Sequence, residues 1–125
     1  MWSDLHYEQL TTVSDLIRRK KLSSVEVTEA TLKRIAKLDG HYRAYATVLA
    51  ERALAQAKTA DAEIARGLWR GPLHGVPIAV KDLCYTTFAP TQAGATIFKS
   101  FVPSFNATVV VDRRASPNFR QRAPA

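Results

Sequence analysis

The clearest pattern of apolar positions lies in residues 24–38, where aliphatic side chains recur at helical intervals as Val25, Leu32, Ile35 and Leu38. Ser23 and Glu26 open this stretch with the Ser-x-x-Glu spacing of a capping box, in which each side chain accepts a hydrogen bond from the other residue's backbone N–H. Gly40 supplies a stop signal after the last apolar position. The pattern therefore predicts a helix from about Ser24 to Leu38.

Two further stretches also have helical spacing. Residues 12–21 have one apolar face, and we interpret the basic run Arg18–Lys21 as the face that is turned toward water. Residues 50–65 are rich in alanine, the strongest helix former, and Gly67 follows them in the position of a C-terminal cap. These features predict a short helix before residue 24 and a longer one over residues 50–65.

Two short apolar runs alternate with these helices. Residues 44–49 are partly β-branched, which suits a buried strand, and residues 76–80 form a second run between a Gly- and Pro-rich approach and the charged pair Lys81–Asp82. Pro77 cannot donate to a sheet ladder, so we expect it at the start of the second strand or at an unpaired edge position. The order helix, strand, helix, strand predicts an α/β fold.

Lys81 is the residue whose position is most informative about chemistry. A lysine at the end of an apolar strand can be partly buried, and burial disfavours the ammonium form and brings an amine toward the range a general base needs. The structural alternative is a lysine whose aliphatic stem lies on the strand while its charged end reaches solvent. Local composition alone favours this structural alternative.

The residues around Lys81 change that balance. Residues 71–83, Gly-Pro-Leu-His-Gly-Val-Pro-Ile-Ala-Val-Lys-Asp-Leu, closely resemble the lysine-bearing block of the amidase signature family. Residues 90–95, Pro-Thr-Gln-Ala-Gly-Ala, are similar to that family's Thr-x-Ala-Gly-Ser segment. The resemblance covers roughly residues 5–110 and implies a partial amidase-signature domain, with helices flanking the strands of a mixed sheet.

The resemblance also implies a mechanism. The family's lysine belongs to a Ser, cis-Ser, Lys triad that hydrolyses carboxamides, which makes Lys81 the catalytic base that draws a proton from the nucleophilic serine through the bridging serine. By resemblance, neither a metal nor an organic cofactor is required. Both family serines and the glycine-rich oxyanion segment lie well downstream of the lysine block. We therefore expect the 125-residue chain to be inactive alone, and to act on an amide substrate only when the missing region completes it.

Several other side chains have competing interpretations. Ser100, Ser104 and Ser116 follow Lys81 but lack a glycine-rich context, so we do not expect any of them to be the nucleophile. Cys84 with His74 could be a thiol and its base, although an inert cysteine beside a loop histidine is the favoured interpretation.

Two positions near Lys81 leave their alternatives open. Asp82 could orient Lys81 or cap a local turn. Phe88 stands where the family commonly has glycine, so the loop after the lysine is expected to be shaped differently or strained. Trp69 and Tyr85 are interpreted as packing or rim aromatics rather than as substrate contacts.

Residues 111–125 depart from the family pattern and are predicted to be an aberrant basic tail, disordered or frameshifted. Residues 106–110 resemble the start of a family helix, but Pro117 would break that helix and no apolar periodicity follows it. Moving the reading frame by one base over suitable codons for residues 116–120 would give Ala-Gln-Ile-Phe-Gly, close to the strand the family has there. A frameshift, a pseudogene product and one half of a split amidase all remain hypotheses.

Charge and composition exclude other classes of protein. The net charge of +7 raises a small basic nucleic-acid-binding module as an alternative, but residues 1–112 carry 14 bases against 11 acids, so most of the excess lies in the tail. No apolar run approaches the ~18–20 residues of a membrane span, and the N-terminus lacks the features of a signal peptide, which predicts a cytoplasmic protein without a membrane partner. Cys84 is the only cysteine, so no intrachain disulfide can form.

Overall fold

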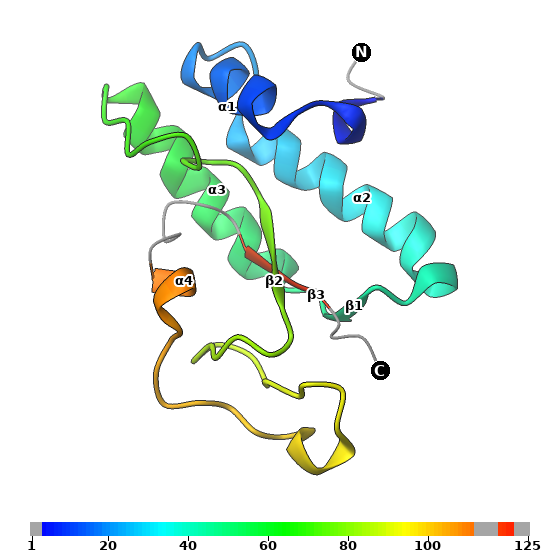
Figure 1. The fold of residues 1–125 in the computed structure, drawn as a ribbon. Coiled ribbons are helices and arrows are strands. Elements are labelled where there is room, and N and C mark those ends of the chain that lie inside the picture. The colour runs from blue at the N-terminus through cyan, green and yellow to red at the C-terminus, as the bar shows by residue number, and fades with distance from the viewer. Residues whose placement is uncertain (1–3, 112–117, 122–125) are drawn as a thin grey trace.

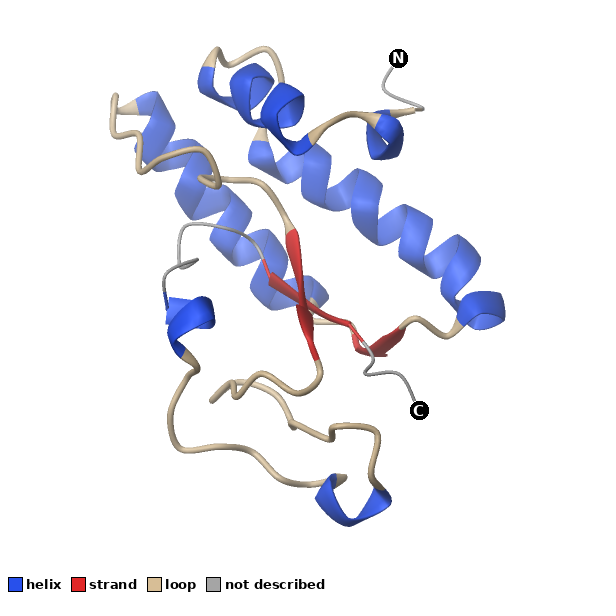
Figure 2. Ribbon diagram, in the orientation of Figure 1, coloured by secondary structure: helices blue, strands red, loops and turns tan. Residues whose placement is uncertain are grey.

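The computed structural model describes residues 4–111 and 118–121 (Figures 1 and 2). The elements in chain order are η1 (Leu5–Tyr7), α1 (Leu10–Arg18), α2 (Ser24–Tyr42), β1 (Tyr45–Thr47), α3 (Ala50–Ala65), β2 (Ile78–Lys81), η2 (Thr96–Phe98), α4 (Thr108–Val111) and β3 (Asn118–Gln121). The predicted succession of helices and strands up to residue 81 is confirmed, and so is the α/β class. The strands are shorter than the apolar runs that predicted them.

Helix α2 begins where the capping box predicted. The Ser23 Oγ accepts the backbone N–H of Glu26 at 3.0 Å, and the Glu26 Oε2 accepts the backbone N–H of Ser23 at 2.8 Å. The carboxylate of Asp61, on α3, accepts the two remaining N–H groups of the first turn, those of Ser24 at 2.7 Å and Val25 at 3.1 Å. The start of α2 is therefore satisfied by its own sequence and by a neighbouring helix.

The end of α2 differs from the prediction. The helix continues through Gly40 to Tyr42, and Arg43 ends it in the left-handed conformation with φ of 50°. A glycine inside a helix costs only about 1 kcal/mol, so it weakens a helix without stopping it. The side chain of Asp39 decides the end instead, because its Oδ1 accepts the backbone N–H groups of Ala44 at 2.6 Å and Tyr45 at 3.1 Å.

Helix α3 has the predicted bounds and the predicted cap. Gly67 has φ of 86° and donates its N–H to the carbonyl of Ile64 at 3.0 Å, while Leu68 donates to the carbonyl of Glu63 at 3.0 Å. These two bonds form a Schellman motif, in which a left-handed glycine satisfies the last carbonyls of a helix. Small buried side chains on α3, namely Ala53, Ala57 and Ala60, let it approach α2 closely.

The main core joins the three helices to the segment that leads into β2. Its buried members come from η1, α1, the loop between α1 and α2, α2, α3 and the approach to β2, and they are Leu5, Val13, Ile17, Leu22, Val27, Ile64 and Val76. Trp69 packs against this cluster, which confirms its interpretation as a packing aromatic. The residues just before β2 are therefore fixed against the helical layer (Figure 1).

The three strands form a mixed sheet in the order β1-β3-β2. Strand β3 is antiparallel to β1 and parallel to β2, with Ile78 opposite Asn118 and Lys81 opposite Gln121. Strand β2 lies at one edge and begins immediately after Pro77, as expected for a residue that cannot donate. Residues 118–121, which lie in the predicted aberrant tail, form strand β3.

Candidate functional site

Lys81 is the last residue of β2, and its backbone position is set by the ladder to β3. Its side chain is exposed, and no hydrogen bond or ion pair joins its ammonium group to another residue in the described part of the chain. It borders a surface pocket of about 390 Å³, which is otherwise lined by Ile78, Ala79, Val80, Cys84, Val109 and Val110. The burial expected for this lysine from its strand position is therefore absent, while an apolar pocket lies beside it.

Asp82 is buried and holds a second loop beside Lys81. Its Oδ1 accepts the backbone N–H of Gln92 at 3.1 Å, and its carbonyl accepts the N–H of Ala93 at 2.8 Å. Ala93 and Gly94 both have left-handed backbones, with φ of 50° and 73°, so the chain turns sharply at this point. The Asp82 side chain therefore fixes a turn in another segment, and it brings the two family-like segments of the sequence together.

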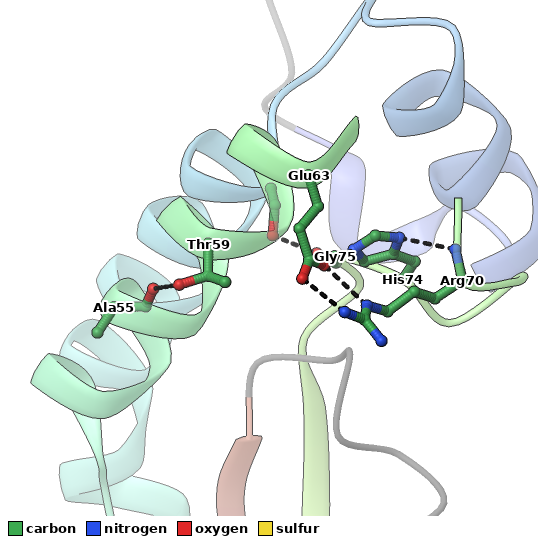
Figure 3. A network of polar contacts seen from close by, with 7 residues as sticks. Ala55, Thr59, Glu63, Arg70, His74 and Gly75 are labelled. Carbon is green, nitrogen blue, oxygen red and sulfur yellow. Dashed lines mark hydrogen bonds and ion pairs between the residues drawn. The ribbon is translucent and has the colours of Figure 1, made fainter. Parts of the chain in front are cut away.

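A buried histidine ties the other end of residues 71–83 to α3 (Figure 3). The His74 Nδ1 accepts the backbone N–H of Arg70 at 3.0 Å, so the proton of the neutral ring is on Nε2, which donates to the Glu63 Oε2 at 2.9 Å. The Arg70 guanidinium donates to both carboxylate oxygens of Glu63, at 2.9 and 2.8 Å. The hydrogen bond from Arg70 is the main reason that the pKa of Glu63 is lowered below its ordinary value.

Gly75 is a position of close approach between this segment and the helices α1 and α2. It has φ of 81°, and an added Cβ would lie 3.1 Å from the Ser24 Cβ and 3.3 Å from the Ile17 Cγ2. The Ser24 hydroxyl donates to the Gly75 carbonyl at 2.5 Å. Only glycine combines this backbone conformation with this space. The second glycine of the family-like block therefore has a structural reason to be present.

The roles of Glu63 and Asp61 have no signal in the sequence pattern. Both stand on the polar side of a helix pattern, and their partners lie 11 and more than 30 positions away in the chain. No local spacing rule connects residues at these separations. Their roles depend on how α3 packs against α2 and against residues 70–75.

Other candidate residues have clear positions. Both ring nitrogens of His74 are occupied, so His74 is not available as a base for Cys84. Phe88 does not have a positive φ, which excludes left-handed strain there, and the Arg52 guanidinium lies 3.9 Å from the centre of its ring. Ser100 and Ser104 are exposed and do not line the pocket at Lys81, and Ser116 lies outside the described residues.

The described residues offer no evident site for a metal ion. Among residues 4–111 and 118–121, no three His, Cys, Asp or Glu side chains come together in a group that could hold one. None of the helices in this part of the chain is long and apolar enough to cross a membrane. The site consists of an amine at the end of a strand, an apolar pocket beside it, and a loop that Asp82 fixes.

Comparison with known proteins gives a consistent result. The sequence model of the amidase family matches residues 26–116. AmiD, an amidase-family protein of Mycobacterium tuberculosis, is 59% identical over 108 residues, which are 86% of this chain and 23% of AmiD. One component of the glutamyl-tRNA(Gln) amidotransferase of Anaeromyxobacter dehalogenans is 49% identical over 94 residues, which are 75% of this chain and 19% of that component.

Solved structures agree with the sequence comparison. The peptide amidase of Stenotrophomonas maltophilia matches 97% of this chain with a TM-score of 0.86 and 28% identity, and the matched part is 25% of that enzyme. A bacterial aryl acylamidase of the amidase signature family matches 94% of this chain with a TM-score of 0.83 at 22% identity, which supports the fold. The chain spans about a quarter of the length of the relatives that it matches.

Proposed function

Because this chain belongs to the amidase family, we propose that it is the lysine-bearing part of an amide hydrolase and that Lys81 is its catalytic base. The observation that carries this proposal is the position of Lys81. It stands at the end of β2 beside an apolar pocket, with the loop of Gln92 and Ala93 fixed next to it by Asp82. Residues 71–83, which resemble the family's lysine block, form this arrangement.

The chemistry follows from the resemblance to the Ser, cis-Ser, Lys triad. A neutral Lys81 amine accepts a proton from a bridging serine, which in turn accepts one from the nucleophilic serine as that serine attacks the amide carbonyl. The relay then returns this proton to the leaving nitrogen, so that ammonia or an amine departs and an acyl-enzyme remains. Water attacks the acyl-enzyme ester and releases the acid. The β2 ladder sets the backbone of Lys81, and Asp82 acts as a positioning residue for the adjoining loop.

We further propose that the 125-residue chain does not hydrolyse amides by itself. The described lining of the pocket at Lys81 contains no hydroxyl group that could serve as the bridging serine. Loss of a nucleophile removes the covalent route, and loss of one oxyanion donor typically costs about 2.7–4 kcal/mol in the barrier. The serines have to come from the rest of an amidase polypeptide, either joined to this chain or supplied by a second one.

The test is complementation. The 125-residue chain is co-expressed with the part of AmiD that follows the matched segment, and ammonia release from a panel of primary carboxamides is measured after the two are purified together. We expect hydrolysis by the pair and none by the chain alone. Lys81→Ala in the pair should lower the rate at least about 10⁴-fold, as loss of a triad member does, whereas Lys58→Ala, at an exposed position of α3, should change it less than about threefold.

Two results would overturn this proposal. One is amide hydrolysis by the isolated 125-residue chain that persists through repeated purification. The other is a purified pair that hydrolyses amides equally well with and without Lys81→Ala. The class of amide is part of the proposal as well: a solved relative is named a peptide amidase, and we propose a carboxamide as the group that is hydrolysed.

For residues 111–125 we propose a change of reading frame. The support is the lack of apolar periodicity after Pro117, just beyond the end of the family-model match at residue 116, and the strand-like peptide that an adjacent frame can encode. Strand β3 does not distinguish the present reading frame from the adjacent one. Its ladder to β2 is made by backbone groups, which are the same whichever side chains are encoded. The gene sequence tests this directly: no amidase continuation with paired serines in either alternative frame would refute it. The cytoplasmic location and the lack of nucleic-acid and membrane partners stay predictions.

A further inference from the structure

The loop that follows Lys81 presents an aromatic surface to solvent. We define this aromatic loop surface by its exposed large apolar side chains, which are Tyr85, Ile97, Phe98, Phe101, Val102 and Phe105. Ile97 is 86% exposed and Phe105 is 61% exposed. In Figures 1 and 2 the loop extends away from the helices, beyond the end of β2. Apolar side chains that are gathered on one loop in this way commonly mark an interaction site.

The aromatic rings form a contiguous group. The ring centre of Tyr85 lies 5.5 Å from that of Phe101 and 5.3 Å from that of Phe105, and the rings of Phe98 and Phe101 are 6.0 Å apart. These separations are typical of aromatic pairs that stabilise each other. The four aromatic residues of the surface are therefore one connected group and not isolated exposed side chains.

The composition of the loop suits a covered environment. Lys99 is the only charged residue in positions 83–111, whereas 23% of the whole chain is charged. Loops that stay in water are normally polar, because their exposed side chains gain nothing from being apolar. A nearly uncharged segment with several exposed aromatic residues is the composition expected at the centre of an interface.

The loop is also held in shape. Thr91 donates its backbone N–H to the carbonyl of Phe101 at 2.8 Å, and Ala107 donates to the carbonyl of Tyr85 at 2.9 Å. The Asn106 side chain accepts the backbone N–H of Thr87 at 2.8 Å. A surface that is organised before a partner arrives loses less conformational entropy on binding.

The aromatic loop surface adjoins the pocket at Lys81. Cys84 lines that pocket and precedes Tyr85 directly, while Val109 and Val110 line it from the other end of the loop. A polypeptide seated on the aromatic loop surface would therefore lie next to Lys81. This is where the serines of the proposed mechanism are needed.

We propose that the aromatic loop surface is the docking site for the remaining part of an amidase-family polypeptide. The argument for this occupant is that nearly all of this chain, 97%, matches a single folded enzyme in which the matched part is only 25%. The loop belongs to that matched fold, and the other three quarters of the fold offer the partner. This inference rests on the proposed function, because it names the partner that would bring the serines to Lys81.

The experiment measures binding separately from hydrolysis. The tagged 125-residue chain is co-expressed with the part of AmiD that follows the matched segment, and the stoichiometry and dissociation constant of the purified pair are measured by light scattering and titration. Phe101→Ser with Phe105→Ser is compared with Tyr7→Ser with Tyr42→Ser, a control that removes two exposed aromatic residues elsewhere. Circular dichroism of each chain alone monitors the helices.

We expect a 1:1 complex that the Phe101→Ser and Phe105→Ser pair weakens at least about 30-fold, because buried aromatic anchors dominate interface energies. The control pair should change binding less than about threefold. Hydrogen exchange should show protection of residues 96–106 on binding. Failure of soluble chains to associate, equal weakening by both variant pairs, or self-association of the 125-residue chain through the same aromatic residues would each overturn the proposal.

The two proposals can fail separately. Lys81→Ala should leave the dissociation constant unchanged while it abolishes hydrolysis. A complex that forms through the aromatic loop surface but does not hydrolyse amides would refute Lys81 as the base and support docking. Hydrolysis by a pair that is insensitive to Phe101→Ser and Phe105→Ser in both binding and rate would refute docking and support the function.

Discussion

The two ends of the segment 71–83 are held in opposite ways. At one end His74 is 1% exposed, and both its ring nitrogens have partners from Arg70 and Glu63. At the other end the Lys81 side chain is exposed and makes no polar contact with another described residue. The buried end is completed by residues 17–75 of the chain itself. The exposed end leaves the Lys81 amine accessible to a group from outside the described part of the chain.

This difference in burial indicates that the two ends of the segment have different roles. Burial of a polar group is stable only when its hydrogen bonds are made, so the His74 end is stable only with the partners of both ring nitrogens in place. An exposed amine costs little free energy to leave without a partner. The His74 end is therefore expected to govern stability and the Lys81 end to govern chemistry. Substitutions at the two ends test this division.

The largest expected effect is at Gly75. Gly75→Ala places a Cβ against Ser24 and Ile17 at φ of 81°, and the backbone strain and overpacking together should lower the free energy of unfolding by about 2–5 kcal/mol. Urea unfolding followed by circular dichroism measures this. Gly40→Ala is the matched control, since no atom lies within 4 Å of its added Cβ, and it should stabilise α2 by about 0.5–1 kcal/mol. Equal effects at both glycines would contradict the close approach.

His74→Ala is expected to have the next largest effect. It removes a buried ring, takes one hydrogen bond away from Glu63 and leaves the Arg70 backbone N–H without its acceptor, which should cost about 2–4 kcal/mol of unfolding free energy. The control is His41→Ala at an exposed position of α2, with an expected change within about 0.5 kcal/mol at pH 8. A loss below 1 kcal/mol for His74→Ala would show that the cluster does not stabilise the fold.

Acid should weaken the His74 end through Glu63, by less than the two substitutions above. The hydrogen bond from Arg70 lowers the pKa of Glu63 in the folded chain below its ordinary value of 4.5. Between the lowered pKa and pH 4.5, the unfolded state binds more protons than the folded state. The stabilisation from the Glu63 carboxylate is therefore complete above pH 4.5 and is lost as the pH falls through the lowered pKa. Glu63→Gln should flatten the pH dependence of the unfolding free energy below pH 4.5, and an unchanged slope would contradict the role of Glu63.

The smallest expected effect on stability is at Lys81. Lys81→Ala removes an exposed side chain without a described polar partner, so the free energy of unfolding should change by less than about 0.5 kcal/mol. The same substitution should abolish hydrolysis in the complemented enzyme. A destabilisation comparable to that of His74→Ala would show that Lys81 is a structural residue in this fold, and the contrast between the two ends would disappear.

The regular elements were largely predictable because their causes are local. The capping box of Ser23 and Glu26 set the start of α2, and the alanine-rich stretch with Gly67 set both ends of α3. The predicted end of α2 was wrong by four residues. A single glycine is a weak stop, and the Asp39 carboxylate accepts hydrogen bonds from backbone N–H groups beyond Gly40. Spacing rules describe contacts within a turn or two of helix and do not extend further.

The candidate site was predictable only in part. Lys81 and its strand could be found from the sequence, and so could the resemblance that gives them a family. The sequence did not predict that Asp82 fixes the turn at Gln92 and Ala93, or that Glu63 is the partner of His74. These contacts join segments that are 10 and 11 residues apart through loops whose course depends on packing.

The sequence by itself determined which residues form the helices, where the lysine-bearing strand lies, and which family the chain resembles. Local propensity, capping and a contiguous thirteen-residue block carry that information. Only the tertiary structure decided that Gly75 has to be glycine, that His74 is a buried structural residue, and that Lys81 with its aromatic loop faces solvent. These properties depend on which surfaces meet when α2, α3 and β2 pack, and burial exists only after they have packed.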